Sequence, residues 1–143
     1  MSSAVGARVM RAESELPGGA EPRYTIATLV SDRAQYDAMR ASFLAGGFSG
    51  GDCEYLFVDN TGPRQTDAYR GLNALLNAAR APAVILCHQD VRLLSDGRDA
   101  LDARLSSLGQ IDANWAVAGN AGGVAPGQLA LRISDPHGRD VRV

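Results

Sequence analysis

Polar residues with metal-binding and phosphate-binding chemistry directly follow three apolar runs in this sequence. They are Ser31 and Asp32 after residues 24–30, Asp59 and Asn60 after residues 54–58, and His88, Gln89 and Asp90 after residues 83–87. Carboxylate oxygens suit hard divalent cations such as Mg²⁺ or Mn²⁺, which commonly bind through one or two carboxylates plus the phosphates of a ligand. The pattern therefore indicates a site for a divalent cation and a diphosphate. The alternative interpretation is that Asp90 only caps a turn.

The three apolar runs are short and rich in β-branched or aromatic residues, which predicts strands. Between them, apolar residues recur at helical spacing. These are Tyr36, Met39, Phe43 and Leu44 after the first run, and Tyr69, Leu72, Leu75, Leu76 and Ala79 after the second. Alternating strands and helices predict a parallel sheet wound by right-handed crossovers. Ligands of such sheets bind beyond the carboxyl ends of the strands, where the polar residues above are expected.

The third run, Ala83–Cys87, has no polar–apolar alternation, which predicts a strand buried on both faces in the middle of the sheet. Farther along, a helix is predicted from Ser95-Asp96 to Gly109, with its leucines on the buried side. Residues 115–119 are then predicted as a fourth strand of the same sheet. A C-terminal β-hairpin is predicted from residues 128–133 and 139–143, which flank a strong turn sequence at 135–138.

The length of 143 residues predicts one domain, residues 23–143, preceded by a flexible tail at residues 1–22 that has little apolar periodicity. The net charge of −2 gives no indication of nucleic-acid binding. No apolar stretch approaches the ~20 residues that span a membrane, and the N-terminus lacks a signal-peptide pattern, so a cytoplasmic location is predicted. The two cysteines, Cys53 and Cys87, are expected to be free thiols.

Several motifs for nucleotides, metals and nucleophiles are missing from the sequence. It has no G-x-x-x-x-G-K-[ST] loop, no glycine fingerprint after the first strand, no cysteine–histidine cluster with zinc spacing and no G-x-S-x-G elbow. These absences argue against a P-loop NTPase, a dinucleotide-binding domain and an α/β-hydrolase. The acidic strand ends are the remaining signal.

Taken together, four segments resemble the first half of a family-2-like glycosyltransferase. They are Tyr24–Val30, Phe57–Gly62, Leu72-Asn73 and the run Leu86–Val91, which reads Leu-Cys-His-Gln-Asp-Val. The closest match is a bacterial subgroup in which the usual Asp-x-Asp motif is written His-Gln-Asp-Val. The resemblance covers about residues 23–125, and the His-Gln-Asp-Val motif is its most specific part.

This resemblance implies an α/β fold: a GT-A-like, Rossmann-related three-layer sandwich with a mainly parallel central sheet and a C-terminal β-hairpin. It also implies a UDP- or GDP-sugar donor over the carboxyl ends of the first strands and transfer to an unknown acceptor. Asp90 and His88 would hold a divalent cation, Mn²⁺ or Mg²⁺. The nucleotide-sugar site implied by the resemblance comprises Ser31, Asp32, Asp59, Asn60, Asn73, Gln89 and Asp90. Imidazole in place of the first aspartate suits Mn²⁺ better than Mg²⁺.

Other readings stay open at this point. Members of the family continue past the length of this chain into an acceptor region with an acidic base, and no residue here can be named as the catalytic base. The chain would then be a fragment or a minimal donor-binding domain. A non-catalytic nucleotide-sugar-binding or interaction domain is one alternative function, and a metal-dependent hydrolase that uses His88, Asp90 and Asp59 is another. A homo-oligomer is also a possible state.

Overall fold

The computed structural model describes residues 7–12, 20–63, 65–119, 121–125 and 128–131. The chain divides into two compact units, residues 1–102 and residues 103–143. The first unit contains the strands β1 (Val9–Arg11), β2 (Tyr24–Val30), β3 (Cys53–Asp59) and β4 (Ala83–Leu86), the helices α1 (Arg33–Ala45) and α2 (Ala68–Ala78), and the 3-10 turn η1 (Gly50–Asp52). The helix α3 (Arg98–Ile111) begins in it. The strands β5 (Ala121–Ala125) and β6 (Gln128–Leu131) belong to the second unit.

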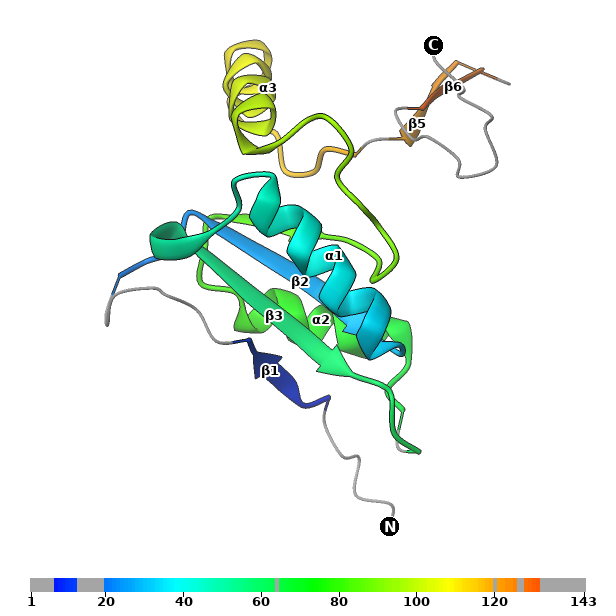
Figure 1. Ribbon diagram of the computed structural model, residues 1–143. Coiled ribbons are helices and arrows are strands. Elements are labelled where there is room, and N and C mark those ends of the chain that lie inside the picture. The colour runs from blue at the N-terminus through cyan, green and yellow to red at the C-terminus, as the bar shows by residue number, and fades with distance from the viewer. Residues whose placement is uncertain (1–6, 13–19, 64, 120, 126–127, 132–143) are drawn as a thin grey trace. The chain divides into compact units, whose positions relative to one another are not determined.

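The first unit is built on a mixed four-stranded sheet with the order β1-β3-β2-β4 (Figure 1). Strands β2, β3 and β4 are parallel, and β1 joins the edge of β3 in the antiparallel sense. Tyr24 at the start of β2 is level with both Cys53 and Ala83. The three strands therefore begin together, although β4 ends level with Ala27, before β2 and β3 end. Their common direction confirms the predicted parallel arrangement of residues 24–30, 54–58 and 83–87.

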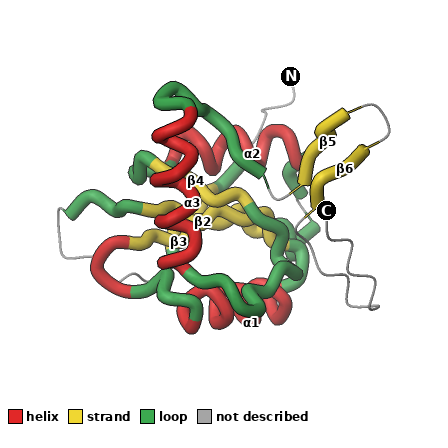
Figure 2. The backbone as a smooth tube through the Cα atoms, turned by 90° about the horizontal axis from the view of Figure 1, so that it is seen from above, coloured by secondary structure: helices red, strands yellow, loops and turns green. Residues whose placement is uncertain are grey.

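The two helices of the first unit cover opposite faces of the sheet (Figure 2). Helix α1 buries Tyr36, Met39 and Phe43, and the Tyr36 ring lies 5.1 Å from that of Phe57. On the other face, Leu75 of α2 joins a buried apolar cluster, whose other members are Ala27, Leu56 and Val58. The α/β class is therefore confirmed. The GT-A-specific arrangement is not established by these elements and stays a prediction.

Local sequence signals fix the helix ends. Asp32 and Asp67 precede α1 and α2, and their carboxylates accept hydrogen bonds from the amides of Gln35 at 3.1 Å and Arg70 at 2.9 Å. After α1, Gly47 adopts a φ of 92°, a conformation that favours glycine. Helix α1 therefore begins directly after an N-capping aspartate and ends at the Gly46-Gly47 pair.

A buried carboxylate ties together three parts of the chain at the amino-terminal end of β3. The side chain of Glu54 is fully buried, and it accepts hydrogen bonds from the Thr25 hydroxyl at 2.7 Å and the Arg80 amide at 2.8 Å. The guanidinium groups of Arg80, at 3.0 Å, and Arg11 form ion pairs with it. Arg11 also donates to the carbonyl of Ala78 at 3.2 Å. Strand β1 is thus joined to the end of α2 through this carboxylate.

Strand β1 changes the interpretation of the N-terminal segment. Residues 1–22 are predicted as a flexible tail, yet Val9–Arg11 pair with Leu56, Phe57 and Val58 of β3. The run of three strand residues is too short to give a periodic signal, and the long-range partner supplies the order. The domain boundary at residue 23 stays a prediction.

Strand β4 is an edge strand among the described residues, so the prediction of a central, doubly buried strand is wrong. Its first three residues are half-buried, and Leu86 is 44% exposed. The predicted core stripe of α2 is likewise only partly buried. Leu75 is fully buried, whereas Tyr69 and Leu76 are 77% and 45% exposed and Leu72 is partly exposed. An apolar composition marks candidate core positions but does not show whether an element has a neighbour on both sides.

The last third of the chain differs most from expectation. Residues 115–119 form no strand, and α3 continues through Gly109 with no fully buried side chain. Residues 121–125 form β5 and pair with β6 in the antiparallel sense. The second arm of the predicted hairpin, residues 139–143, lies outside the described residues, so that hairpin stays a prediction.

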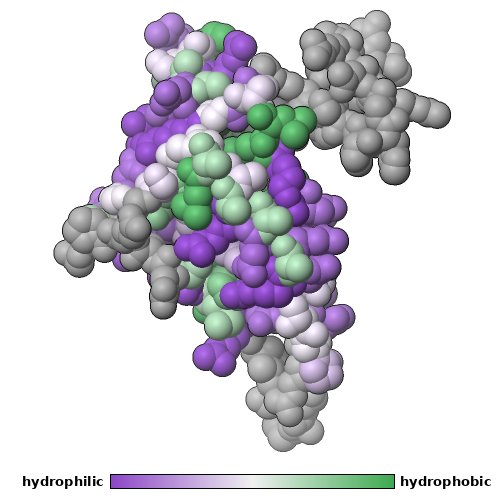
Figure 3. All heavy atoms as spheres, viewed as in Figure 1, coloured by the Kyte–Doolittle hydropathy of each residue, from purple (hydrophilic) through white to green (hydrophobic). Residues whose placement is uncertain are grey.

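On the face drawn in Figure 1, hydrophilic residues predominate on the surface (Figure 3).

Candidate functional site

The carboxyl ends of β3, β2 and β4 lie at one edge of the sheet. The chain passes from β2 to β3 on one side and later to β4 on the other side of β2. The position between β2 and β4 is therefore the point at which the winding reverses, and ligands of open α/β sheets bind in the crevice at such a point. The turns that follow β2 and β4 contain five of the residues predicted for the site: Ser31, Asp32, His88, Gln89 and Asp90.

Gln89 joins these two turns. Its Oε1 accepts hydrogen bonds from the amides of Ser31 at 2.7 Å and Asp32 at 2.9 Å, and its Nε2 donates to the Ser31 hydroxyl at 2.9 Å. Asp32 uses its own carboxylate to cap α1. Gln89, Ser31 and Asp32 were predicted to contact a ligand, but in this structure their polar groups bind one another. They hold the turn after β4 in place.

This arrangement has an electrostatic consequence for any anionic ligand. The N-terminus of a helix attracts anions through its free amides. Here the amides of Ser31, Asp32 and Gln35 are already bonded to side-chain oxygens. These three amides are therefore not available to a phosphate at this edge.

Asp59 and Asn60 follow β3 and behave differently. The exposed Asp59 accepts hydrogen bonds at Oδ1 from the hydroxyl of Thr61 at 2.6 Å and from its amide at 2.9 Å. These bonds hold the pKa of Asp59 below its usual value, with a smaller contribution from Arg33. Asn60 is buried, and its side-chain amide donates to the Thr66 carbonyl at 2.8 Å and accepts from the Thr66 amide at 2.9 Å. Asn60 therefore closes the loop before α2 and does not face a ligand.

The side chains of His88 and Asp90 are both exposed. No hydrogen bond or ion pair joins either side chain to another residue in the described part of the chain. The backbone of this turn is closed by a hydrogen bond from the Val91 amide to the His88 carbonyl at 3.3 Å. With Gln89 fixed between them, both side chains project from an anchored turn. Of the five predicted residues in the two turns, they are the two whose side chains make no hydrogen bond within the described part of the chain.

Asn73 does not join the other predicted residues through any hydrogen bond within the described ranges. It lies on the exposed side of α2, in the middle of the helix. The structure therefore gives no reason to include it in the site.

Arg33 belongs to this edge but was not predicted. It is the first residue of α1, and its guanidinium carbon lies 4.3 Å from the centre of the Phe57 ring and 5.2 Å from that of Tyr36. Such stacking on aromatic faces holds the cation beside Asp59. Its place after an N-cap is visible in the sequence, but the ring beneath it is contributed by β3 and is visible only in the fold.

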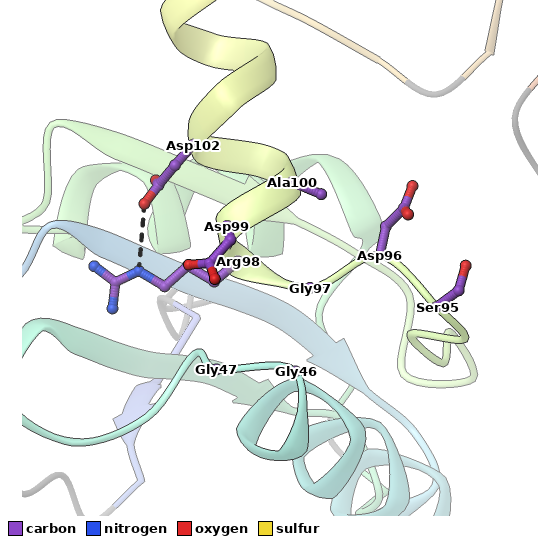
Figure 4. A pocket seen from close by; sticks show the side chains of 9 residues that line it. All are labelled: Gly46, Gly47, Ser95, Asp96, Gly97, Arg98, Asp99, Ala100 and Asp102. Carbon is purple, nitrogen blue, oxygen red and sulfur yellow. Dashed lines mark ion pairs between the residues drawn. The ribbon is translucent and has the colours of Figure 1, made fainter.

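A separate pocket of about 630 Å³ lies at the opposite, amino-terminal edge of the sheet (Figure 4). Its wall is formed by the start of α3, the segment before it and the turn after α1. The lining residues are Gly46, Gly47, Ser95, Asp96, Gly97, Arg98, Asp99, Ala100 and Asp102. The turns of the predicted site contribute none of these residues.

The positive charge in this pocket is already neutralised. Arg98 forms a two-pronged ion pair with Asp52, including a hydrogen bond of 2.7 Å, and its Nε lies 3.7 Å from Asp102. These contacts hold the pKa of Asp52 below its usual value. Asp102 also accepts hydrogen bonds from Arg23 and Tyr24. The cluster fastens the first turn of α3 to the sheet, which is a structural role.

No family model matches this chain. A curated protein from Fuscovulum blasticum, named ATP synthase subunits region ORF 6, is 34% identical to it over 125 residues. The alignment covers 83% of this chain and 50% of that protein. The chain thus spans about half the length of the curated relative that it matches.

This relative overturns the predicted function. It is named for a region of ATP synthase subunits and not as a glycosyltransferase. The prediction of a glycosyltransferase-like domain that binds a nucleotide-sugar donor is therefore wrong. The alternatives predicted with it, a nucleotide-sugar-binding domain and a metal-dependent hydrolase, gain no support from this match. The resemblance of the His-Gln-Asp-Val segment to that family stays a prediction.

Two further observations limit what the site can be. Within the described residues, no helix has the length and apolar character needed to cross a membrane, and the cytoplasmic location stays a prediction. Those same residues contain no group of three or more His, Cys, Asp or Glu side chains arranged to hold a metal ion. A cation held only by protein side chains is therefore not indicated in this part of the chain.

Proposed function

We propose that the carboxyl edge of β2 and β4 binds a divalent cation together with a small phosphate compound. The observation that supports this proposal is the pair of exposed side chains, His88 and Asp90, on a turn that Gln89 anchors at the reversal point of the sheet. One carboxylate and one imidazole are too few for an all-protein metal site. They suit a cation that completes its coordination with phosphate oxygens and water.

The charge balance at this edge favours binding through a cation. Asp32, Asp59 and Asp90 are all exposed there, and the amides of Ser31 and Asp32 are already bonded. A bare phosphate would meet more negative than positive charge, since the nearby cations are Arg33 and Arg92, which donates to the carbonyls of Gln89 and Val91. A divalent cation at Asp90 would reverse this balance and attract the phosphate.

The metal-ligand atoms of His88 and Asp90 also favour Mn²⁺ over Mg²⁺. Imidazole is a good ligand for Mn²⁺, whereas Mg²⁺ prefers oxygen ligands in strict octahedral geometry. We therefore choose Mn²⁺ as the test cation, with pyrophosphate as the simplest diphosphate. ADP and ATP are the first nucleotides to test, because the relative is named for a region of ATP synthase subunits.

Asp90→Asn is expected to weaken Mn²⁺ binding in the presence of pyrophosphate by at least about tenfold. Asn keeps the shape of Asp but loses the charge that attracts the cation, and the lost interaction is charge-assisted. Free Mn²⁺ can be measured by electron paramagnetic resonance during a titration of each protein. Asp37→Asn is the matched control, because Asp37 is an exposed aspartate on α1 in a weak ion pair with Arg33 at 3.9 Å.

His88 gives the second arm of this test. His88→Asp should shift the preference from Mn²⁺ toward Mg²⁺, since it replaces a nitrogen ligand with oxygen ligands. The proposal fails if the wild type takes up no Mn²⁺ with pyrophosphate, ADP or ATP, or if Asp90→Asn binds as tightly as the wild type. Unchanged thermal unfolding of the variants would show that the fold is intact.

A further inference from the structure

The outer edge of β4 presents unpaired backbone groups. Among the described strands, β4 pairs with β2 alone. The Cys87 amide donates to the Ala27 carbonyl at 3.2 Å. Because the N–H and C=O groups of a strand alternate in direction, those of Ala83 and Ile85 also face β2. The N–H and C=O groups of Val84 and Leu86 therefore point away from the sheet.

Between Pro82, which precedes the strand, and the turn after Leu86, this edge lacks the charged residues and bulges that usually prevent one sheet from pairing with another. Natural edge strands are protected by charged residues, proline or bulges. Residues 83–86 read Ala-Val-Ile-Leu, and their pairing with β2 shows no shift in register. Leu86 is 44% exposed. Among the described residues, no strand pairs with this edge, and its residues are apolar.

The apolar surface continues onto α2. This helix packs mainly on β2, β3 and β1, so that on the same face of β4 Val84 is half-buried against the apolar cluster and Leu86 is exposed. Leu75 faces the sheet, and the crossover from β3 to β4 is expected to be right-handed. Leu72 and Leu76 then lie on the side of α2 that is nearer to β4. Both are exposed. The open edge and these leucines form one apolar surface.

We propose that β4 pairs with β4 of a second copy of this chain, antiparallel and about a two-fold axis at Ile85. In this register Val84 of one copy is opposite Leu86 of the other, and each pair exchanges both backbone hydrogen bonds. The segment centred on Ile85 is its own complement, as a two-fold interface requires. The result is one continuous sheet through both copies.

Charge complementarity supports a second copy as the occupant. Arg80 precedes β4 and shares the single carboxylate of Glu54 with Arg11, which leaves a net positive charge at this end, whereas Asp90 follows the strand and residues 81–86 have no charge. An antiparallel pair brings the positive end of one strand beside the negative end of the other at both ends of the seam. A parallel pair would instead place like charges side by side, which is unfavourable.

The first test is the mass of the full 143-residue chain by sedimentation equilibrium across a range of concentrations. The wild type is expected to dimerise. Leu86→Lys should raise the dissociation constant by at least about tenfold, because it puts a charge on the exposed end of the edge. Leu94→Lys is the matched control, since Leu94 is also exposed but lies outside β4. Thermal unfolding would confirm that both variants fold.

The second test fixes the register. Ile85→Cys brings two thiols opposite each other across the axis, at a spacing that permits a disulfide. Oxidised glutathione should convert them to a 85–85 cross-link and be reduced itself. Leu86→Cys is more exposed but lies opposite Val84, so it should not cross-link to itself. Mass spectrometry of the cross-linked peptide distinguishes residue 85 from the native cysteines.

Each outcome bears on the proposal. Dimerisation that Leu86→Lys weakens, with a cross-link at residue 85 and none at residue 86, supports it. A monomer at all concentrations would overturn it, as would a dimer that neither Leu86→Lys nor oxidation of Ile85→Cys affects. Cross-linking at residue 86 in preference to residue 85 would exclude the proposed axis.

Discussion

Replacing Glu54 with Gln is expected to lower the free energy of unfolding by about 2–3 kcal/mol. The Glu54 carboxylate is fully buried and binds two arginines, a hydroxyl and an amide. Gln keeps one carbonyl oxygen but turns a donor toward groups that are themselves donors. Both arginines are about half exposed and can turn to water, which limits the loss.

Denaturant unfolding of Glu54→Gln beside Asp37→Asn measures this effect. Asp37 forms an exposed pair with Arg33, so its loss should cost less than about 0.5 kcal/mol. A change at Glu54 as small as that at Asp37 would mean that the network does not hold β1 and α2 to the sheet. Arg11→Met should also destabilise the chain, since it leaves the buried carboxylate with one arginine fewer.

Leu75→Ala is expected to lower the free energy of unfolding by about 2–5 kcal/mol. The Leu75 side chain is fully buried against Ala27, Leu56 and Val58, between α2 and the sheet. Truncation removes apolar burial and leaves a cavity that the surrounding strands cannot close.

The neighbouring leucine is the control. Leu76 is 45% exposed on the same helix, so Leu76→Ala should cost about 1 kcal/mol or less. Equal losses at the two positions would contradict the packing of α2 described above. Denaturant midpoints and slopes for both variants separate a loss of stability from a change in the unfolded state.

These two leucines also show how far the sequence reaches. The helical spacing of α2 predicts the helix correctly and places both leucines on one apolar side. Only the position of the helix over β2 and β3 decides that Leu75 is covered and Leu76 is not. In the same way, Ala83–Leu86 is apolar enough for a central strand, but its place at the edge depends on which other strands pair with it.

The sequence predicts that the polar residues after the three strands form one site. The fold brings together the residues that follow β2 and β4. The roles within the group were not predictable, because hydrogen-bond partners far apart in sequence assign them. Gln89 bonds to Ser31 and Asp32, 57 to 58 positions away, and so becomes an anchor. Asn60 is occupied by Thr66. The sequence marks Glu54 only as part of a strand, because its arginine partners lie 43 and 26 positions away.

The most direct test of the proposed cation site is to locate bound Mn²⁺ on the full chain by nuclear magnetic resonance. With ¹⁵N-labelled protein and pyrophosphate present, substoichiometric Mn²⁺ should first broaden the amide signals of residues 88–91 and of Ser31 and Asp32. Asp90→Asn should remove this selective broadening. If the signals of residues 96–102 broaden first, beside the aspartates of the other pocket, or if all signals broaden equally, the account of the carboxyl edge is contradicted.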